Sequence, residues 1–255
     1  RRPGPEGEPA VTYCVGLRLN AGLVMLSDTR TNAGLDNISR FGKMFTWERP
    51  GERALCLMTA GNLSITQGVV TALNEACAKA EAGEEVESLL TCATMFRAAQ
   101  LVGDAMAAQQ KRYREQLEES GARAGATLIL GGQRAGGRPR LFLIYDAGNF
   151  IEATEDTAFF QIGEHKYGKP ILDRVITPET PMPQALKAAF VSMDSTLRSN
   201  LSVGMPLDLA VLPAEALRFS VRRRMEQDDP EFQKVSGAWS DSLKAAFSSV
   251  PEIAL

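Results

Sequence analysis

Residues 12–26 have the sequence TYCVGLRLNAGLVML, and this stretch decides the fold. Every second residue from position 13 to position 19 is apolar, which is the period of a β-strand. Asn20-Ala21-Gly22 supplies turn residues, and the apolar run at 23–26 predicts a second strand. The stretch therefore predicts an antiparallel hairpin near the start of the chain.

The rest of the chain repeats this organisation. Strands are predicted at residues 45–47, 54–59, 126–130, 140–145, 150–153, 159–162, 207–212 and 217–221. Helices are predicted at 63–80, 169–174 and 183–198, and a long one carries the stripe Leu89, Cys92, Phe96, Ala99, Gly103 and Met106. Strand runs joined by short turns favour antiparallel pairing. The predicted fold class is α+β, a four-layer αββα sandwich of two antiparallel sheets flanked by helices.

Composition excludes several classes of protein. The 255 residues are 44% hydrophobic and 23% charged, which is typical of a globular chain with a real core. A net charge of −3 disfavours a protein that mainly binds nucleic acid. No apolar run approaches the ~18–20 residues that cross a bilayer, and residues 1–10 have no apolar signal region. We expect a cytoplasmic protein with neither a nucleic-acid partner nor a membrane partner.

The cysteines, the single histidine and one glycine-rich loop argue against redox, zinc and nucleotide sites. The four cysteines show no CxxC spacing and lie in apolar stretches, so we expect them to be buried. His165 is the only histidine, so a zinc site with two histidine ligands is impossible. Residues 163–169 fit seven positions of a phosphate-binding loop, but Pro170 stands where the Mg²⁺-binding Ser or Thr is required. We therefore expect no nucleotide site there, and His165 at the surface.

Four residues are candidates for chemistry: Thr12, Asp28, Lys43 and Gly61. Each begins, ends or adjoins a predicted strand. Taken singly, each has an ordinary structural explanation, because threonine favours strands and glycine supplies unusual backbone conformations. Spacing alone does not decide between the structural and the catalytic interpretation.

The segments around these residues resemble a known family. Thr12-Tyr13-Cys14-Val15-Gly16, Ser27-Asp28-Thr29-Arg30, Gly42-Lys43-Met44-Phe45 and Ala60-Gly61-Asn62 resemble the proteasome β-subunits, which are N-terminal nucleophile hydrolases. Residues 163–173 (GEHKYGKPILD) and 194–202 (DSTLRSNLS) are similar, more narrowly, to the bacterial proteasome-like branch called Anbu. The resemblance runs from Thr12 to about residue 222. It implies the same αββα fold.

The resemblance also implies a role for each residue. Thr12 matches the nucleophile, whose own α-amine serves as the base. Lys43 matches the lysine that lowers the pKa of that amine, and Asp28 the acid that pairs with the lysine. Gly61 matches the glycine whose N–H binds the oxyanion. This chemistry needs no cofactor and no metal ion.

Two supporting elements of the family differ in this chain. Glu164 follows Gly163 where many proteasome β-subunits have a serine. After the helix at 183–198, the nearest matches to the family's Asp and Ser are Asn200 and Ser202. We include both as candidate catalytic-site residues, and the departures put broad proteolysis in doubt.

The chemistry requires Thr12 to begin the mature chain, because an amide nitrogen cannot act as a base. The sequence therefore divides into residues 1–11 (a leader, untranslated sequence or a tag), a hydrolase domain at 12–222, and a C-terminal helical extension at 223–255. As a hypothesis, Val11 is the true start, encoded by GUG, and removal of the initiating Met exposes Thr12. The extension carries the stripe Val235, Trp239, Leu243 and Phe247, which packs on its own domain or on a neighbouring subunit.

The predicted function is a threonine hydrolase that cleaves peptide or related amide bonds inside a homo-oligomer, a ring or a helical stack. One alternative is a small-molecule amidohydrolase or γ-glutamyl-type transferase with the same nucleophile. Another is a non-catalytic assembly subunit. The sequence carries no signature of an unfoldase partner.

Overall fold

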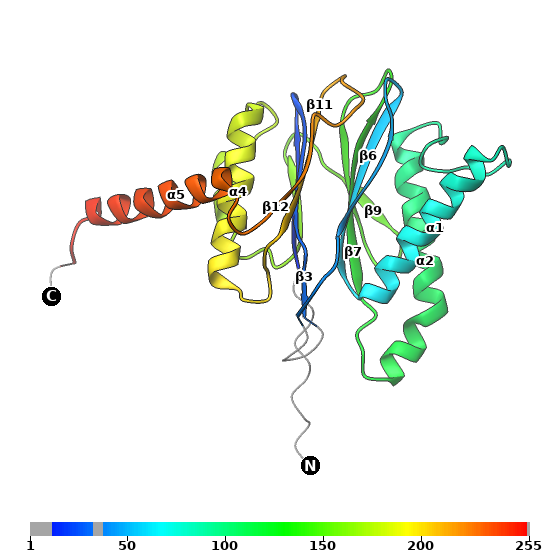
Figure 1. The fold of residues 1–255 in the computed structure, drawn as a ribbon, viewed down its shortest axis with the longest axis horizontal. Helices are drawn as coiled ribbons and strands as arrows, with labels where there is room; N and C mark the ends of the chain where they lie inside the picture. Colours follow the sequence, from blue (N-terminus) through cyan, green and yellow to red (C-terminus); the bar gives the residue numbers. More distant parts are fainter. Residues whose placement is uncertain (1–11, 33–37, 254–255) are drawn as a thin grey trace, which may run out of the picture.

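Two five-stranded antiparallel sheets form the centre of the molecule (Figure 1). The computed structural model describes residues 12–32 and 38–253, so the predicted leader at 1–11 lies outside the described residues. The first sheet has the order β10 (Phe159–Gly163), β1 (Tyr13–Leu19), β2 (Gly22–Asp28), β11 (Leu207–Pro213), β12 (Val221–Met225). The second has the order β5 (Met44–Arg49), β6 (Arg53–Gly61), β7 (Ala126–Arg134), β8 (Arg140–Ile144), β9 (Phe150–Glu152).

Helices cover the outer face of each sheet. α1 (Leu63–Glu81) and α2 (Met95–Glu119) pack on the second sheet, and α3 (Lys169–Val175) and α4 (Met182–Ser199) pack on the first. A third apolar cluster lies between the two sheets. The predicted fold class, an α+β αββα sandwich, is therefore confirmed (Figure 1). Within the described ranges, no helix has both the length and the hydropathy needed to cross a membrane.

The predicted hairpin is confirmed as β1 and β2, and every residue of both strands is buried. One face of β1 meets α4 and the other meets the second sheet. Tyr13 accordingly belongs to the apolar cluster under the helices, and Cys14 to the cluster between the sheets. Gly16 permits the sheets to approach closely, because a Cβ atom there would lie 3.0 Å from Cδ1 of Leu141.

Two features of the predicted strand pattern differ in the structure. The position predicted for the last strand, 217–221, is wrong, because β12 spans Val221–Met225. Glu215 and Leu217 have φ values of 64° and 50°, which lie outside the range of a strand. A separate hairpin of β3 (Arg30–Asn32) and β4 (Ile38–Arg40) was not predicted. It lies in a polar segment, which has no alternation of apolar and polar residues that would predict a strand.

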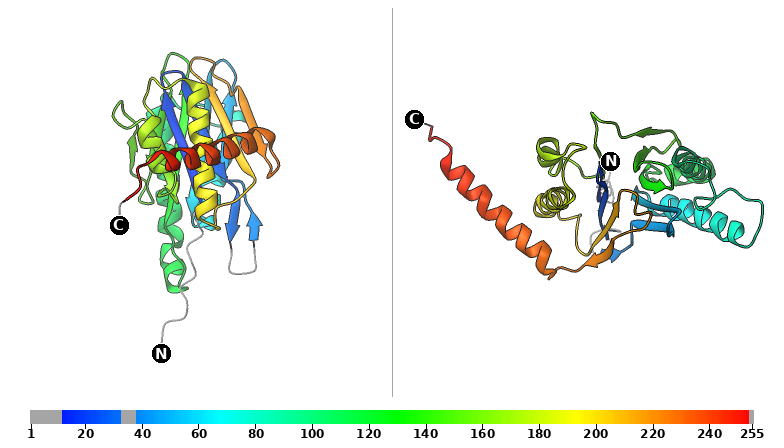
Figure 2. Two further views of the ribbon diagram at one scale, coloured as in Figure 1. Left: turned by 90° about the vertical axis from the view of Figure 1, so that its left-hand side faces the viewer. Right: turned by 90° about the horizontal axis from the view of Figure 1, so that it is seen from above.

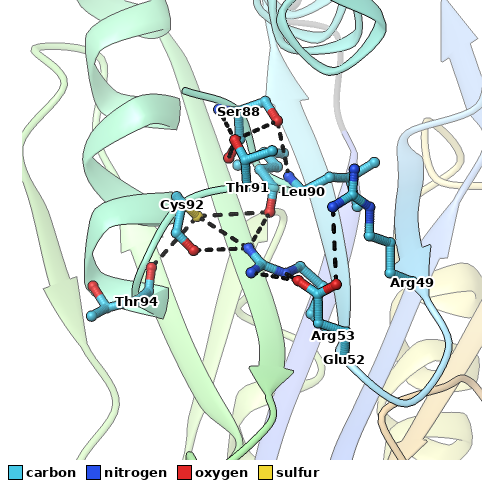
Figure 3. A network of polar contacts seen from close by, with 9 residues as sticks. Arg49, Glu52, Arg53, Ser88, Leu90, Thr91, Cys92 and Thr94 are labelled. Atoms are coloured by element: carbon cyan, nitrogen blue, oxygen red, sulfur yellow. Dashed lines mark hydrogen bonds and ion pairs between the residues drawn. The ribbon is translucent and has the colours of Figure 1, made fainter. Parts of the chain in front are cut away.

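The long helix begins at Met95 instead of Leu89, because a buried arginine holds residues 88–94 in a loop. Figure 3 shows Arg53 of β6, whose Nη1 donates to the carbonyl oxygens of Cys92 (2.8 Å) and Leu89 (3.2 Å). Thr94 then caps α2 by accepting a hydrogen bond from the N–H of Arg97. The side chains of Leu89 and Cys92 are buried from a loop instead of from a helix.

The helix of the C-terminal extension, α5 (Pro230–Ser249), packs on the domain over its first half. The rings of Phe232 and Phe190 lie 5.7 Å apart, and Ser236 Oγ donates to Asp194 of α4 at 2.7 Å. Beyond that point the helix extends away from the sandwich (Figure 2). Phe247, near its end, is 81% exposed in the single chain.

Candidate functional site

Three of the predicted residues meet at one end of the first sheet. Thr12 immediately precedes β1, and Asp28 ends the neighbouring strand β2. Lys43 comes just before β5 of the second sheet, and its Nζ lies 2.7 Å from Oδ1 of Asp28. The same Oδ1 accepts the N–H of Tyr13 at 3.1 Å, so the ion pair is tied to the backbone next to Thr12.

The ion pair is buried. The side chain of Asp28 is fully shielded from solvent, and that of Lys43 is 6% exposed. Lys43 also donates to the carbonyl oxygen of Arg30 at 2.6 Å, and Asp28 Oδ2 accepts the N–H of Gly204 at 3.3 Å. Burial raises the pKa of Asp28 above its ordinary value, and the Lys43 ammonium acts in the opposite direction. Removing two charges from water is costly, so this buried pair is a candidate functional site.

The backbone of Thr12 is fixed on its other side by the end of β10. The N–H of Glu164 donates to the Thr12 carbonyl oxygen at 2.6 Å. Gly163 has a φ of 80°, and a Cβ atom at this position would overlap that oxygen. Thr12 is 4% exposed. Its position is thus set from β2 on one side and from β10 on the other.

Gly61 ends β6 at the same end of the sandwich. Thr59, two residues earlier, donates its N–H to the carbonyl oxygen of Lys43 at 2.9 Å. The φ of Gly61 is 104°, and a side chain there would overlap the carbonyl oxygen of Gly125. The next residue, Asn62, caps α1 with its side chain, which accepts from the N–H groups of Ser64 and Ile65. Gly61 therefore occupies a sharp strand-to-helix turn that demands glycine.

Asn200 and Ser202 lie in the loop after α4, which contacts both sides of the site. Nδ2 of Asn200 donates to Oε2 of Glu164 at 3.3 Å, and Oδ1 accepts the N–H of Ser202 at 2.9 Å. The N–H of Gly204, in the same loop, binds Asp28. Asn200 is linked to Thr12 through Glu164, whose N–H binds the Thr12 carbonyl oxygen. Ser202 is linked to Asn200 by its backbone N–H.

Sequence reasoning missed a second buried network behind Thr12. The hydroxyl of Tyr13 lies 2.5 Å from Oγ of Ser192 and accepts a hydrogen bond from Nε2 of Gln161 at 2.6 Å. Burial raises the pKa of Tyr13 to about 12. These partners are 179 and 148 positions away from Tyr13, so no local pattern could have linked them.

The glycines of the loop at 163–169 have packing roles. Gly163 lies against Thr12, and a Cβ atom at Gly168 would crowd the Tyr13 hydroxyl at 2.6 Å. His165 is exposed, as predicted. The four cysteines are free and buried, also as predicted. Within residues 12–32 and 38–253 there is no cluster of three or more His, Cys, Asp or Glu side chains that could hold a metal ion.

The chain is similar to solved Anbu structures over almost its whole length. It is 44% identical to "Anbu (ancestral beta-subunit)" from Yersinia bercovieri, covering 95% of this chain and 99% of that chain with a TM-score of 0.88. It is 48% identical to an "Anbu (Gly-1) mutant" from Hyphomicrobium sp. strain MC1, covering 96% and 100% with a TM-score of 0.87. The "Helical Assembly of the Anbu Complex" from Pseudomonas aeruginosa matches at 44% identity, 95% and 98% coverage and a TM-score of 0.88. No family model and no curated protein matches.

Proposed function

Because this chain belongs to the Anbu family of proteasome-like β-subunits, we propose that it is an N-terminal threonine hydrolase that cleaves peptide or related amide bonds inside a homo-oligomer. The observation that supports this most is the buried pair of Lys43 and Asp28 at the start of β1. A scaffold has no need for a desolvated ammonium beside Thr12, whereas an amine base does. Free, buried cysteines are compatible with a reducing cytoplasm, which we propose as its location.

The proposed reaction has two halves. The α-amine of Thr12 accepts the hydroxyl proton while Oγ attacks the carbonyl carbon of the amide bond. The N–H of Gly61 stabilises the oxyanion, a contribution of about 3–4 kcal/mol in other hydrolases. The carbon–nitrogen bond then breaks, the leaving amine takes up the proton, and an ester on Thr12 remains. Water, deprotonated by the same amine, hydrolyses the ester and regenerates Thr12.

Lys43 favours the neutral, basic form of the amine. An α-amine has an unperturbed pKa of about 7.7–8.0. A nearby ammonium lowers that pKa because two positive charges repel each other. Asp28 orients Lys43 through their 2.7 Å contact.

This function is tested by comparing chains in which the α-nitrogen of Thr12 is a free amine or part of a peptide bond. Two preparations are compared, one that begins at Thr12 by intact mass and one that retains residues 1–11. We expect the first alone to hydrolyse fluorogenic peptides and to gain the mass of a peptide epoxyketone. Equal rates from the second would contradict the mechanism, since its nitrogen at Thr12 is an amide.

The same preparations separate the alternative functions. Turnover of γ-glutamyl amides but not of peptides would identify a small-molecule enzyme. A free Thr12 that neither turns over substrate nor reacts with the epoxyketone would identify a non-catalytic assembly subunit.

We also propose that α5 forms part of the contact between copies of the chain. Leu243 and Phe247 are 49% and 81% exposed and belong to the second half of α5. This half of the helix extends away from the domain (Figure 2). Beside them, a groove of about 710 Å³ between α3, α4 and α5 is lined by Ile171, Val191 and Trp239. A neighbouring copy would cover these apolar surfaces, and a head-to-tail contact of this kind builds rings or helices. The helical assembly of the Pseudomonas aeruginosa Anbu complex supports association of copies of the chain into a helix.

Phe247→Asp is expected to weaken this assembly at least about 10-fold, because a charge would enter an apolar contact. Light scattering on a sizing column should show a smaller particle than for the wild-type chain at equal concentration. Ser248→Asp adds the same charge at the neighbouring exposed position and is the control. Unchanged particle mass for Phe247→Asp, with intact folding, would exclude this part of α5 from the contact.

A further inference from the structure

Two acidic residues flank Thr12, which immediately precedes β1. β1 lies between β2 and β10 in the first sheet. Asp28 ends β2 and accepts the N–H that follows Thr12. Glu164 follows β10 and donates its own N–H to the Thr12 carbonyl oxygen. The backbone of Thr12 therefore lies between two acidic residues.

Glu164 is held in one place by neutral partners. Its Oε1 accepts the N–H of Lys166 at 3.1 Å, and its Oε2 accepts Nδ2 of Asn200 at 3.3 Å. Asn200 is itself oriented by the N–H of Ser202. These hydrogen bonds fix the carboxylate but bring no positive charge to it. The carboxylate is half-buried, so solvent screens it only in part.

The other charged and titratable side chains around Thr12 come from several elements. Lys43 and Asp28 form an ion pair with no net charge. The side chain of Arg30 lies against Gly204, whose N–H binds Asp28. Lys166 is exposed to solvent, as is His165, whose ring contacts the carbonyl oxygen of Gly163. The loop at 200–204 contributes no ionisable side chain. Within the described residues the Glu164 carboxylate forms no ion pair, and its backbone N–H binds the carbonyl oxygen of Thr12.

We propose that Glu164, held by Asn200, is a positioning residue that accepts a hydrogen bond from the α-ammonium of Thr12 and sets the pH at which this amine becomes a base. This inference rests on the proposed function, in which Thr12 carries a free amine. A carboxylate stabilises the ammonium, so it opposes Lys43 and raises the pKa of the amine. The amine then loses its proton only at a higher pH, and the acid limb of the activity profile lies correspondingly higher.

The test compares the wild-type chain beginning at Thr12 with Glu164→Gln. Glutamine keeps the acceptor for Asn200 but removes the charge. The pH dependence of acetylation of the Thr12 amine by acetic anhydride, followed by mass spectrometry, reports its pKa without any substrate. We expect the midpoint to fall by about one pH unit in Glu164→Gln, and the acid limb of kcat/KM to move with it. Thermal melting verifies that both chains are folded.

Asp173→Asn is the matched control. Asp173 is exposed on α3 and pairs with Lys169, so its loss should leave the midpoint unchanged. Asn200→Ala keeps the charge but frees the carboxylate, and should give a smaller shift than Glu164→Gln. Equal midpoints for wild type and Glu164→Gln would overturn the proposal. If no preparation hydrolyses peptides, the proposed function fails while the acetylation midpoints still decide the role of Glu164.

Discussion

Replacing Thr12 by alanine in a chain that begins at residue 12 is expected to lower kcat for peptide hydrolysis by about 10⁴-fold or more. The change removes the only oxygen that the proposed reaction acylates. The ion pair of Lys43 with Asp28 and the Gly61 turn would remain, and they cannot attack an amide themselves. Steady-state rates with a fluorogenic peptide measure the loss.

Alanine at this position should leave the fold intact. The contacts that hold residue 12 in place are backbone ones: its carbonyl oxygen binds Glu164, and the N–H of Tyr13 binds Asp28. Thermal unfolding should therefore occur within a few degrees of wild type. Thr12→Ser keeps a hydroxyl and an amine and should retain far more activity than Thr12→Ala. Comparable turnover by the alanine chain would show that another group is the nucleophile.

The fold was predictable because local sequence patterns indicate most of its strands and helices. Residues 12–26 carry both a strand period and a turn signal, and the hairpin of β1 and β2 follows them. Prediction was wrong where a distant side chain decides the local structure. Residues 88–94 have a helical spacing of apolar residues, yet Arg53, more than thirty positions earlier, holds them in a loop (Figure 3).

The candidate site was predictable only in part. Thr12, Asp28, Lys43 and Gly61 came from segments that resemble a family, and the structure brings them to one end of the sandwich. The sequence marks Glu164 only as a departure from the family pattern and does not link it to Asn200. Its link to Asn200 spans 36 positions and depends on how α4 ends, which no sequence period encodes.

Lys43→Met is expected to lower kcat by about 10³-fold and the free energy of unfolding by about 3–5 kcal/mol at neutral pH. The activity falls because the amine of Thr12 loses the ammonium that keeps it neutral. The stability falls because Asp28, fully buried, is left as an unpaired charge. Peptide hydrolysis and urea unfolding measure the two effects separately.

The pH dependence of this loss follows from Asp28. Burial raises its pKa even with Lys43 present, and without the ammonium the pKa rises further. A carboxyl whose pKa is raised by folding contributes stability at low pH, which is lost as the pH rises through that pKa. The stability deficit of Lys43→Met should therefore shrink as the pH falls through the raised pKa of Asp28, because the carboxyl then becomes neutral.

A double variant separates the buried charge from simple loss of packing. Asp28→Asn combined with Lys43→Met leaves no unpaired charge, and the asparagine oxygen can still accept the N–H of Tyr13. We expect it to recover much of the lost stability at pH 8 but none of the activity. If the double variant is as unstable as Lys43→Met, the stem of Lys43 stabilises the fold by packing. Recovery of stability without activity would instead mean that the buried pair serves the reaction, because the Lys43 ammonium lowers the pKa of the Thr12 amine.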